Sequence, residues 1–260
     1  MNAYVQQNQP PGVPPLELTG ERTLPDVPAE NYWFQRHLAV YEWIGARVVG
    51  LRVLDLACGE GYGSEVLSRG AADVVGVDAN PEAHDHARLR YRRQNLSFLR
   101  GMVETFGEPG AYDAVVFLQT IEHVQDPAAV LAHVRGLLAG GGTAYISTPN
   151  VLTLAPAGQA RSGNPWHVRE YRAEEFEALC RSAFAHVELL GLFHARKLWL
   201  HGVALRAGWD RLHAGLRITK AFYDRFTPSI DSRDFRLRSA AEAGAGGIDA
   251  ALDFLAVCRP

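Results

Sequence analysis

The chain has 260 residues, 47% of them hydrophobic, and its 26 basic side chains nearly balance 29 acidic ones, for a net charge of -3. This length suits one large domain, or a compact domain with added segments. The near balance of charge argues against a nucleic acid or an anionic membrane as the main partner, because no excess positive field exists to hold a polyanion. No apolar run approaches the roughly 18 residues that cross a bilayer. We therefore expect a soluble, cytoplasmic protein, as a single chain or a homo-oligomer.

The first 15 residues contain four prolines among polar residues. Such a composition cannot bury enough apolar surface to offset the entropy lost on ordering. The sequence therefore predicts a disordered tail over 1–15 and a single folded domain over 16–260. Three widely spaced cysteines without a CxxC pair argue against a disulfide framework or a cysteine-ligated zinc.

Residues 16–51 are expected to form a helical cap, since 30–44 carries apolar side chains at helical spacing. From residue 52, short apolar runs alternate with longer amphipathic stretches. The predicted strands are 53–57, 74–78, 96–99, 114–118 and 143–147, with helices at 60–69, 81–93 and 127–138. This alternation predicts an α/β fold, in which helices cover both faces of a mostly parallel sheet.

The last hundred residues continue this pattern with one long interruption. A helix at 173–182 leads to a strand at 187–193, and the apolar run 252–257 predicts the final strand. Residues 195–249 are predicted to form a helical insertion before that strand.

A glycine-rich turn follows the first predicted strand, at 58–64. Glycine permits positive φ and lets a ligand approach the backbone. Asp55 precedes the turn, Glu60 lies inside it, and Asp78 ends the second strand, where an acid can accept both hydroxyls of a ribose. The first two carboxylates would repel a diphosphate and attract a cation. A nucleoside with a cationic tail, S-adenosylmethionine, fits all three acids, although the loop alone would also suit a dinucleotide or an unliganded turn.

Three segments resemble the class I S-adenosylmethionine-dependent methyltransferases: VLDLACGEGYG at 53–63, VD at 77–78 and QTIEHV at 119–124. The resemblance implies S-adenosylmethionine as cofactor, and a Rossmann-like sheet of seven strands in the order 3-2-1-4-5-7-6 with the last strand antiparallel. Methionine stands at 102, where the family usually has the acid that binds adenine. The residues predicted to bind the cofactor are Arg36, Asp55, Gly59, Glu60, Gly61, Asp78, Ala79, Val103, Glu104 and Gln119.

Flanking segments resemble a narrower group, the sugar O-methyltransferases of methylmannose polysaccharide synthesis. The similar segments are 18–23, 30–37, 147–150, 164–170 and 191–194, and the likeness lapses over 197–238. The resemblance implies methylation of a hydroxyl of a sugar or glycoside. The alternatives are a methyltransferase for another small-molecule hydroxyl or amine, and a cofactor-binding module without turnover.

Transfer to a hydroxyl needs alignment of the acceptor and removal of a proton. His123 follows the fourth strand, at the edge where such sheets bind ligands, and is the predicted general base. Glu122 would orient it, and His167 is a further catalytic candidate. In each case a helix cap or an ordinary loop residue is the alternative interpretation.

Acceptor binding is predicted at the loop that carries Trp166 and His167, since an aromatic face covers a pyranose while polar groups bind its hydroxyls. Glu170 and His194 are expected to reach the same cleft. The acids and histidines near these positions, including Asp126, could also ligate a divalent cation, but their scattered spacing makes a metal site the less favoured expectation.

Overall fold

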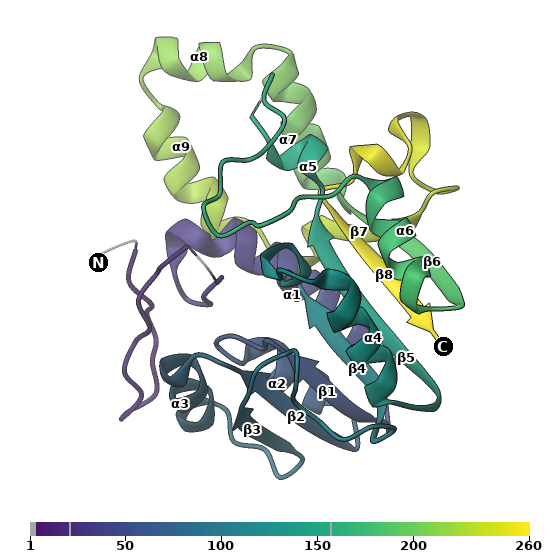
Figure 1. Cartoon of the computed structure of the whole chain (residues 1–260). Coiled ribbons are helices and arrows are strands. Elements are labelled where there is room, and N and C mark those ends of the chain that lie inside the picture. Colours follow the sequence, from purple (N-terminus) through teal and green to yellow (C-terminus); the bar gives the residue numbers. More distant parts are fainter. Residues whose placement is uncertain (1–3, 21, 157) are drawn as a thin grey trace.

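The computed structural model describes residues 4–20, 22–156 and 158–260. Its strands form one sheet in the order β3-β2-β1-β4-β5-β8-β6-β7 (Figure 1). Their bounds are β1 Arg52–Leu56, β2 Asp73–Asp78, β3 Leu96–Arg100, β4 Tyr112–Leu118, β5 Leu138–Pro149, β6 His186–His194, β7 Phe235–Ser239 and β8 Asp253–Arg259. The alternating βα pattern of the sequence places β1 to β4 side by side and parallel, so their carboxyl ends share one edge.

The predicted number of strands is wrong by one. The described residues form an eight-stranded sheet, because β7 lies within the segment that was expected to be purely helical. β7 pairs antiparallel with β6 and extends the sheet at that edge. The last strand, β8, runs antiparallel to both β5 and β6, as predicted.

The helices cover both faces of the sheet. Their bounds are α1 Asn31–Gly45, α2 Tyr62–Ser68, α3 Pro81–Arg90, α4 Pro127–Leu137, α5 Val151–Leu154, α6 Ala173–Ala183, α7 Arg196–Arg206, α8 Trp209–Leu216 and α9 Thr219–Phe226. α4 and α6 pack in one hydrophobic cluster against the strands, and α1 and α2 pack in the other. Two helices start with proline at the first turn behind a capping side chain: Asn80 caps α3 and Asp126 caps α4.

The N-terminal segment contacts the domain mainly through polar groups. Residues 1–3 lie outside the described residues, and 4–15 form no regular element but are packed against the domain. Gln6 is 4% exposed, and its amide donates to Glu60 while its side-chain oxygen accepts from the backbone of Leu16. Polar contacts of this kind hold 4–15 beside the domain although the segment has little apolar surface of its own. The disordered tail over 1–15 stays a prediction.

The insertion at 195–249 contains α7, α8, α9 and β7. Figure 1 shows α7 to α9 as a group that projects from the sheet. Of all the helices in the described ranges, none combines the length and the apolar character needed to cross a bilayer.

Candidate active site at the carboxyl edge of the sheet

A cavity of about 890 Å³ opens at the carboxyl ends of β1, β2 and β4. In open α/β sheets this edge is where ligands bind. Twelve of the predicted site residues line the cavity: Arg36, Gly59, Glu60, Asp78, Ala79, Val103, Glu104, Gln119, Glu122, His123, Trp166 and His167. Asp55, Gly61, Glu170 and His194 do not belong to the lining.

The glycine loop has two glycines with different tasks. Gly59 and Gly61 both have positive φ, of 56° and 96°. A Cβ on Gly59 would meet no atom within 4 Å, so its backbone faces open space in the cavity. A Cβ on Gly61 would lie 2.8 Å from the Cβ of Ala87 on α3. Gly59 therefore leaves room for a ligand, whereas Gly61 allows α2 and α3 to pack.

Asp78 ends β2 and fixes the shape of the loop. Its carboxylate accepts hydrogen bonds from the backbone of Gly59, at 2.8 Å, and of Asn80, at 2.9 Å. The same side chain lines the cavity beside Ala79. One carboxylate thus joins the end of β2 to the glycine loop and still faces the cavity.

Asp55 does not face the cavity, contrary to prediction. Its side chain is fully buried and accepts hydrogen bonds from Ser64, at 2.7 Å, and from Tyr41, at 3.2 Å. Burial raises the pKa of Asp55 to about 7, although these two hydroxyls favour the charged form. Asp55 joins β1 to α1 and α2 and does not attract a cationic ligand.

Glu60 lines the cavity, but its carboxylate is already bound within the protein. It is 1% exposed and accepts hydrogen bonds from Gln6, His86 and Tyr91. The guanidinium of Arg90 lies 3.0 Å away and compensates its charge. The predicted role in attracting the cationic cofactor is therefore corrected, because these partners hold the carboxylate against α3 and the N-terminal segment.

Arg36 on α1 lines the cavity with its guanidinium bound to Asp253. Nε and Nη2 donate to the two carboxylate oxygens of Asp253 at 2.6 and 2.5 Å, and Nη2 also donates to the carbonyl of Leu252. Both side chains are about 95% buried. This ion pair engages Nε and Nη2 and joins α1 to the start of β8. Contact of Arg36 with a cofactor carboxylate stays a prediction.

The wall beyond β3 is lined by Met102, Val103 and Glu104. Met102 is 55% exposed and presents an apolar surface to the cavity. The flat ring of a nucleobase could pack against this surface. Across the cavity, Gln119 follows β4 with φ of 50°, and its side-chain amide donates to the hydroxyl of Ser147 at 3.0 Å. Ser147 therefore fixes the direction of Gln119.

Glu122 and His123 lie in the short helical turn after β4. Glu122 is 1% exposed, and burial raises the pKa of its carboxyl to about 8, while the Thr148 hydroxyl bonds it at 3.1 Å and acts in the opposite sense. His123 bonds through Nδ1 to the carbonyl oxygen of Trp166 at 2.8 Å. A carbonyl only accepts, so Nδ1 carries the proton and Nε2, 4.0 Å from Glu122, is the basic nitrogen of the neutral ring.

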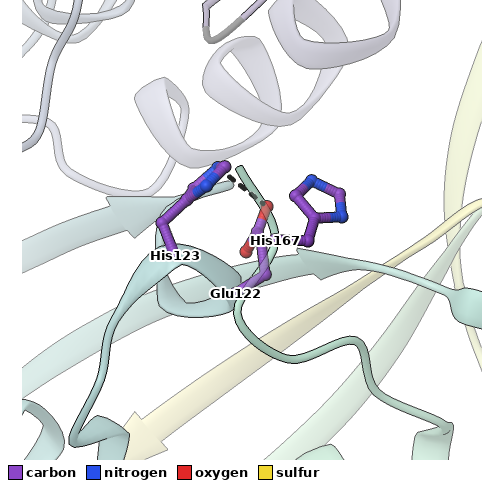
Figure 2. A group of neighbouring side chains, drawn as sticks. All are labelled: Glu122, His123 and His167. Atoms are coloured by element: carbon purple, nitrogen blue, oxygen red, sulfur yellow. Dashed lines mark ion pairs between the residues drawn. The ribbon is translucent and has the colours of Figure 1, made fainter. Parts of the chain in front are cut away.

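The loop predicted to bind the acceptor meets these residues. The backbone amides of Val168 and Arg169 both donate to the carbonyl of Glu122. The rings of His123 and His167 lie edge to face, 5.1 Å apart (Figure 2). Trp166 is 48% exposed at the cavity.

Glu170 contributes to this loop through His167. Its carboxylate accepts from His167 Nδ1 at 2.7 Å and from the backbone and hydroxyl of Ser162. Burial opposes the charge of Glu170, but the bonds from Ser162 and His167 outweigh it and lower the pKa. Glu170 therefore positions His167, and its predicted direct contact with the acceptor is corrected.

His194 does not reach the cavity. Its Nε2 bonds to the hydroxyl of Tyr32 at 2.8 Å, and burial lowers its pKa to about 4. It lines a separate hollow of about 410 Å³ with Trp199 and three arginines. The expectation that the end of β6 joins the main cleft is wrong, because the ring turns toward α1.

Trp33 and Asp253 are among the cavity residues that were not predicted as site residues. Trp33 on α1 is 38% exposed and lines the cavity. Asp253 was missed because a single acid at the start of a strand carries no signal until its partner Arg36, 217 residues away, is known.

Fold and cavity define an α/β protein whose ligand site lies beyond β1, β2 and β4. Residues 29–196 match the family described as a methyltransferase domain, and the chain belongs to that family. A Mycolicibacterium smegmatis protein named as a probable S-adenosylmethionine-dependent methyltransferase is 36% identical over 94% of this chain and 96% of its own. A Mycobacterium tuberculosis protein of the same description is 40% identical over 70% of this chain, and the match spans 66% of that relative. The chain is an S-adenosylmethionine-dependent methyltransferase.

Solved structures agree on the fold. A Haloferax volcanii methyltransferase in complex with the activator Trm112 superposes with a TM-score of 0.57, covering 89% of this chain and 93% of that one, at 18% identity. A Thermotoga maritima S-adenosylmethionine-dependent methyltransferase gives the same TM-score at 15% identity, covering 88% and 92%. The matching family and the two mycobacterial relatives identify S-adenosylmethionine as the cofactor. The open backbone at Gly59 and the carboxylate of Asp78 suit its nucleoside part.

Proposed function

We propose that the protein transfers the methyl group of S-adenosylmethionine to a hydroxyl of a sugar or glycoside. The observation that carries this proposal is the exposed face of Trp166 beside His123 and His167 in one cavity. An aromatic face can cover the apolar side of a pyranose, and the imidazoles can bond its hydroxyls.

The residues of the cavity suit an in-line displacement. The acceptor oxygen attacks the methyl carbon, the bond from carbon to sulfur breaks, and S-adenosylhomocysteine is the product. In the site as described, the hydroxyl proton passes to Nε2 of His123, whose ring is oriented by the bond from Nδ1 to the Trp166 carbonyl. Bringing acceptor and methyl group together supplies much of the rate.

Methyl transfer from radiolabelled cofactor to a panel of mannosides, other glycosides and phenols tests the proposal. We expect product with a sugar hydroxyl and a loss of about 10²- to 10⁴-fold in kcat for His123→Gln, with unchanged affinity for S-adenosylhomocysteine. Unaltered turnover by this variant would remove the base from the mechanism.

A phenolic hydroxyl is the second candidate acceptor. A ubiquinone biosynthesis O-methyltransferase of Xanthomonas campestris is 38% identical over 42% of this chain and 48% of its own length. Methylation of phenols but of no sugar in the same panel would replace the first candidate with the second.

A further inference from the structure

Three side chains of the cavity converge on one point. We propose that Glu122, His123 and His167 bind a divalent transition-metal cation, which holds the acceptor hydroxyl beside the cofactor. One ligand atom of each residue lies within 4.8 Å of those of the other two (Figure 2). Metal binding stands on this geometry alone, whereas its catalytic use rests on the proposed function.

Both imidazoles are held in the tautomer that a metal requires. Nδ1 of His123 bonds to the carbonyl of Trp166 at 2.8 Å, and Nδ1 of His167 bonds to the carboxylate of Glu170 at 2.7 Å. With a proton on each Nδ1, the lone pair is on each Nε2. Metal-binding histidines almost always donate their other N–H to a carbonyl or a carboxylate in this way.

The third ligand is a buried carboxylate that lacks a strong cationic partner. In the described part of the chain, Glu122 bonds to the Thr148 hydroxyl and lies 4.0 Å from His123, but forms no ion pair with lysine or arginine. The other buried acids of the cavity differ, since Asp253 forms an ion pair with Arg36 and Glu60 forms one with Arg90. Burying an uncompensated carboxylate is costly, and a bound cation would offset that cost.

The donor set selects the kind of ion. Two imidazole nitrogens and one carboxylate oxygen suit Zn²⁺, Co²⁺ or Mn²⁺ better than Mg²⁺ or Ca²⁺, which prefer oxygen. Ligand atoms about 2.1 Å from one ion lie roughly 3.3 Å from each other. Small side-chain rotations that move these atoms by about 1 Å would therefore bring all three within bonding distance of one ion. The Asn164 amide, 3.0 Å from His167 Nε2, would yield its place to the ion.

Three protein ligands leave positions open for the acceptor. Its hydroxyl oxygen binds the ion and becomes more acidic, and its proton passes to water. The oxygen then attacks the methyl carbon while the electrons of the broken bond stay on sulfur. When the ion is bound, His123 is one of its ligands. His123 accepts the proton of the acceptor hydroxyl only when the ion is absent.

Calorimetric titration of the untagged, chelator-treated full chain with Zn²⁺ tests binding, and the absorption spectrum of added Co²⁺ reports nitrogen coordination. We expect one ion per chain, and affinity lower by at least about tenfold in Glu122→Gln and in His167→Gln. His186→Gln is the matched control. This histidine is exposed at the first residue of β6 and does not line the cavity. It should bind as the wild type does.

Equal Zn²⁺ affinity in Glu122→Gln, His167→Gln and wild type would overturn the proposal, as would the absence of a nitrogen-coordinated Co²⁺ spectrum in the wild type. Circular dichroism identifies a variant that has lost its fold, and His123→Gln then serves in its place. Failure of the proposed function gives a different pattern, in which the ion binds and no acceptor of the panel is methylated. Methyl transfer that is unaffected by chelation removes only the catalytic use of the ion.

Discussion

The two sides of the cavity use their polar residues differently. On the side of β1 and β2, two of the three predicted acids, Asp55 and Glu60, are buried and bonded within the protein. On the side of β4 and the loop at 164–170, Glu122, His123 and His167 turn toward one another at the cavity. Polar residues of the first side therefore mainly shape the backbone that receives the cofactor, while those of the second side are available for chemistry.

The largest expected effect separates the two sides by function. His123→Gln should abolish most turnover without changing cofactor affinity, because it removes the proposed base and leaves the cofactor side of the cavity intact. Asp78→Asn should instead weaken S-adenosylhomocysteine binding by about 10- to 100-fold, because hydrogen bonds to a charged group contribute about 1.5 to 3 kcal/mol. Calorimetry and initial rates on both variants measure this contrast. Equal losses of affinity in the two variants would show that the sides are not distinct.

The next effect concerns the ion pair that lies between the two sides. Arg36→Met leaves Asp253 buried without its partner, and we expect a loss of about 3 to 5 kcal/mol in the free energy of unfolding. The double variant Arg36→Met with Asp253→Leu should recover part of this loss, since no uncompensated charge remains. Urea denaturation provides the measurement. A double variant less stable than Arg36→Met would contradict a mainly electrostatic cause.

The pH dependence of stability tests the internal role of Asp55. Its pKa is raised to about 7 in the folded protein, so the folded state holds a proton that the unfolded state has released above pH 4. The contribution is fully present below pH 4 and is lost progressively as pH rises to about 7, by up to about 4 kcal/mol at 1.36 kcal/mol per pKa unit. Asp55→Asn should remove this dependence. Parallel denaturation curves for both proteins between pH 5 and 8 would contradict it.

The smallest effects distinguish the two glycines of the loop. Gly59→Ala should lower the free energy of unfolding by about 1 to 2 kcal/mol, because alanine is strained at positive φ. The new methyl group should also weaken cofactor binding, because it points into the space left for the ligand. Gly61→Ala adds a clash with Ala87 and should lower the melting temperature further. Thermal melts with and without S-adenosylhomocysteine measure both. A larger loss of stability in Gly59→Ala would reverse the assignment.

Much of the fold could be predicted because its signals are local. The alternation of apolar runs and amphipathic stretches identified each strand except β7. That strand reads FRLRS, an alternating pattern of the kind strands have, but it is short and lies within a segment of helical periodicity. A five-residue strand is stabilised by its pairing with β6, and pairing is not visible in its own sequence.

The positions of the site residues were also predictable, but the directions of their side chains were not. Residues that follow β1, β2 and β4 must meet at one edge of a parallel sheet, which places Gly59, Asp78 and His123 near one another. Whether a carboxylate faces the cavity depends on partners distant in sequence. Glu60 turns to Gln6, 54 residues away, because that amide and the side chains of α3 satisfy it.

The loop that carries Trp166 is anchored on both sides. Glu170 holds Ser162, and the carbonyl of Glu122 holds the amides of Val168 and Arg169. The residues from 163 to 166 therefore lie between two anchored points of the loop. On the proposal that this loop binds the acceptor, replacing residues 163 to 166 as a block, with His167 and both anchors retained, should change the acceptor preference while leaving the cofactor half untouched.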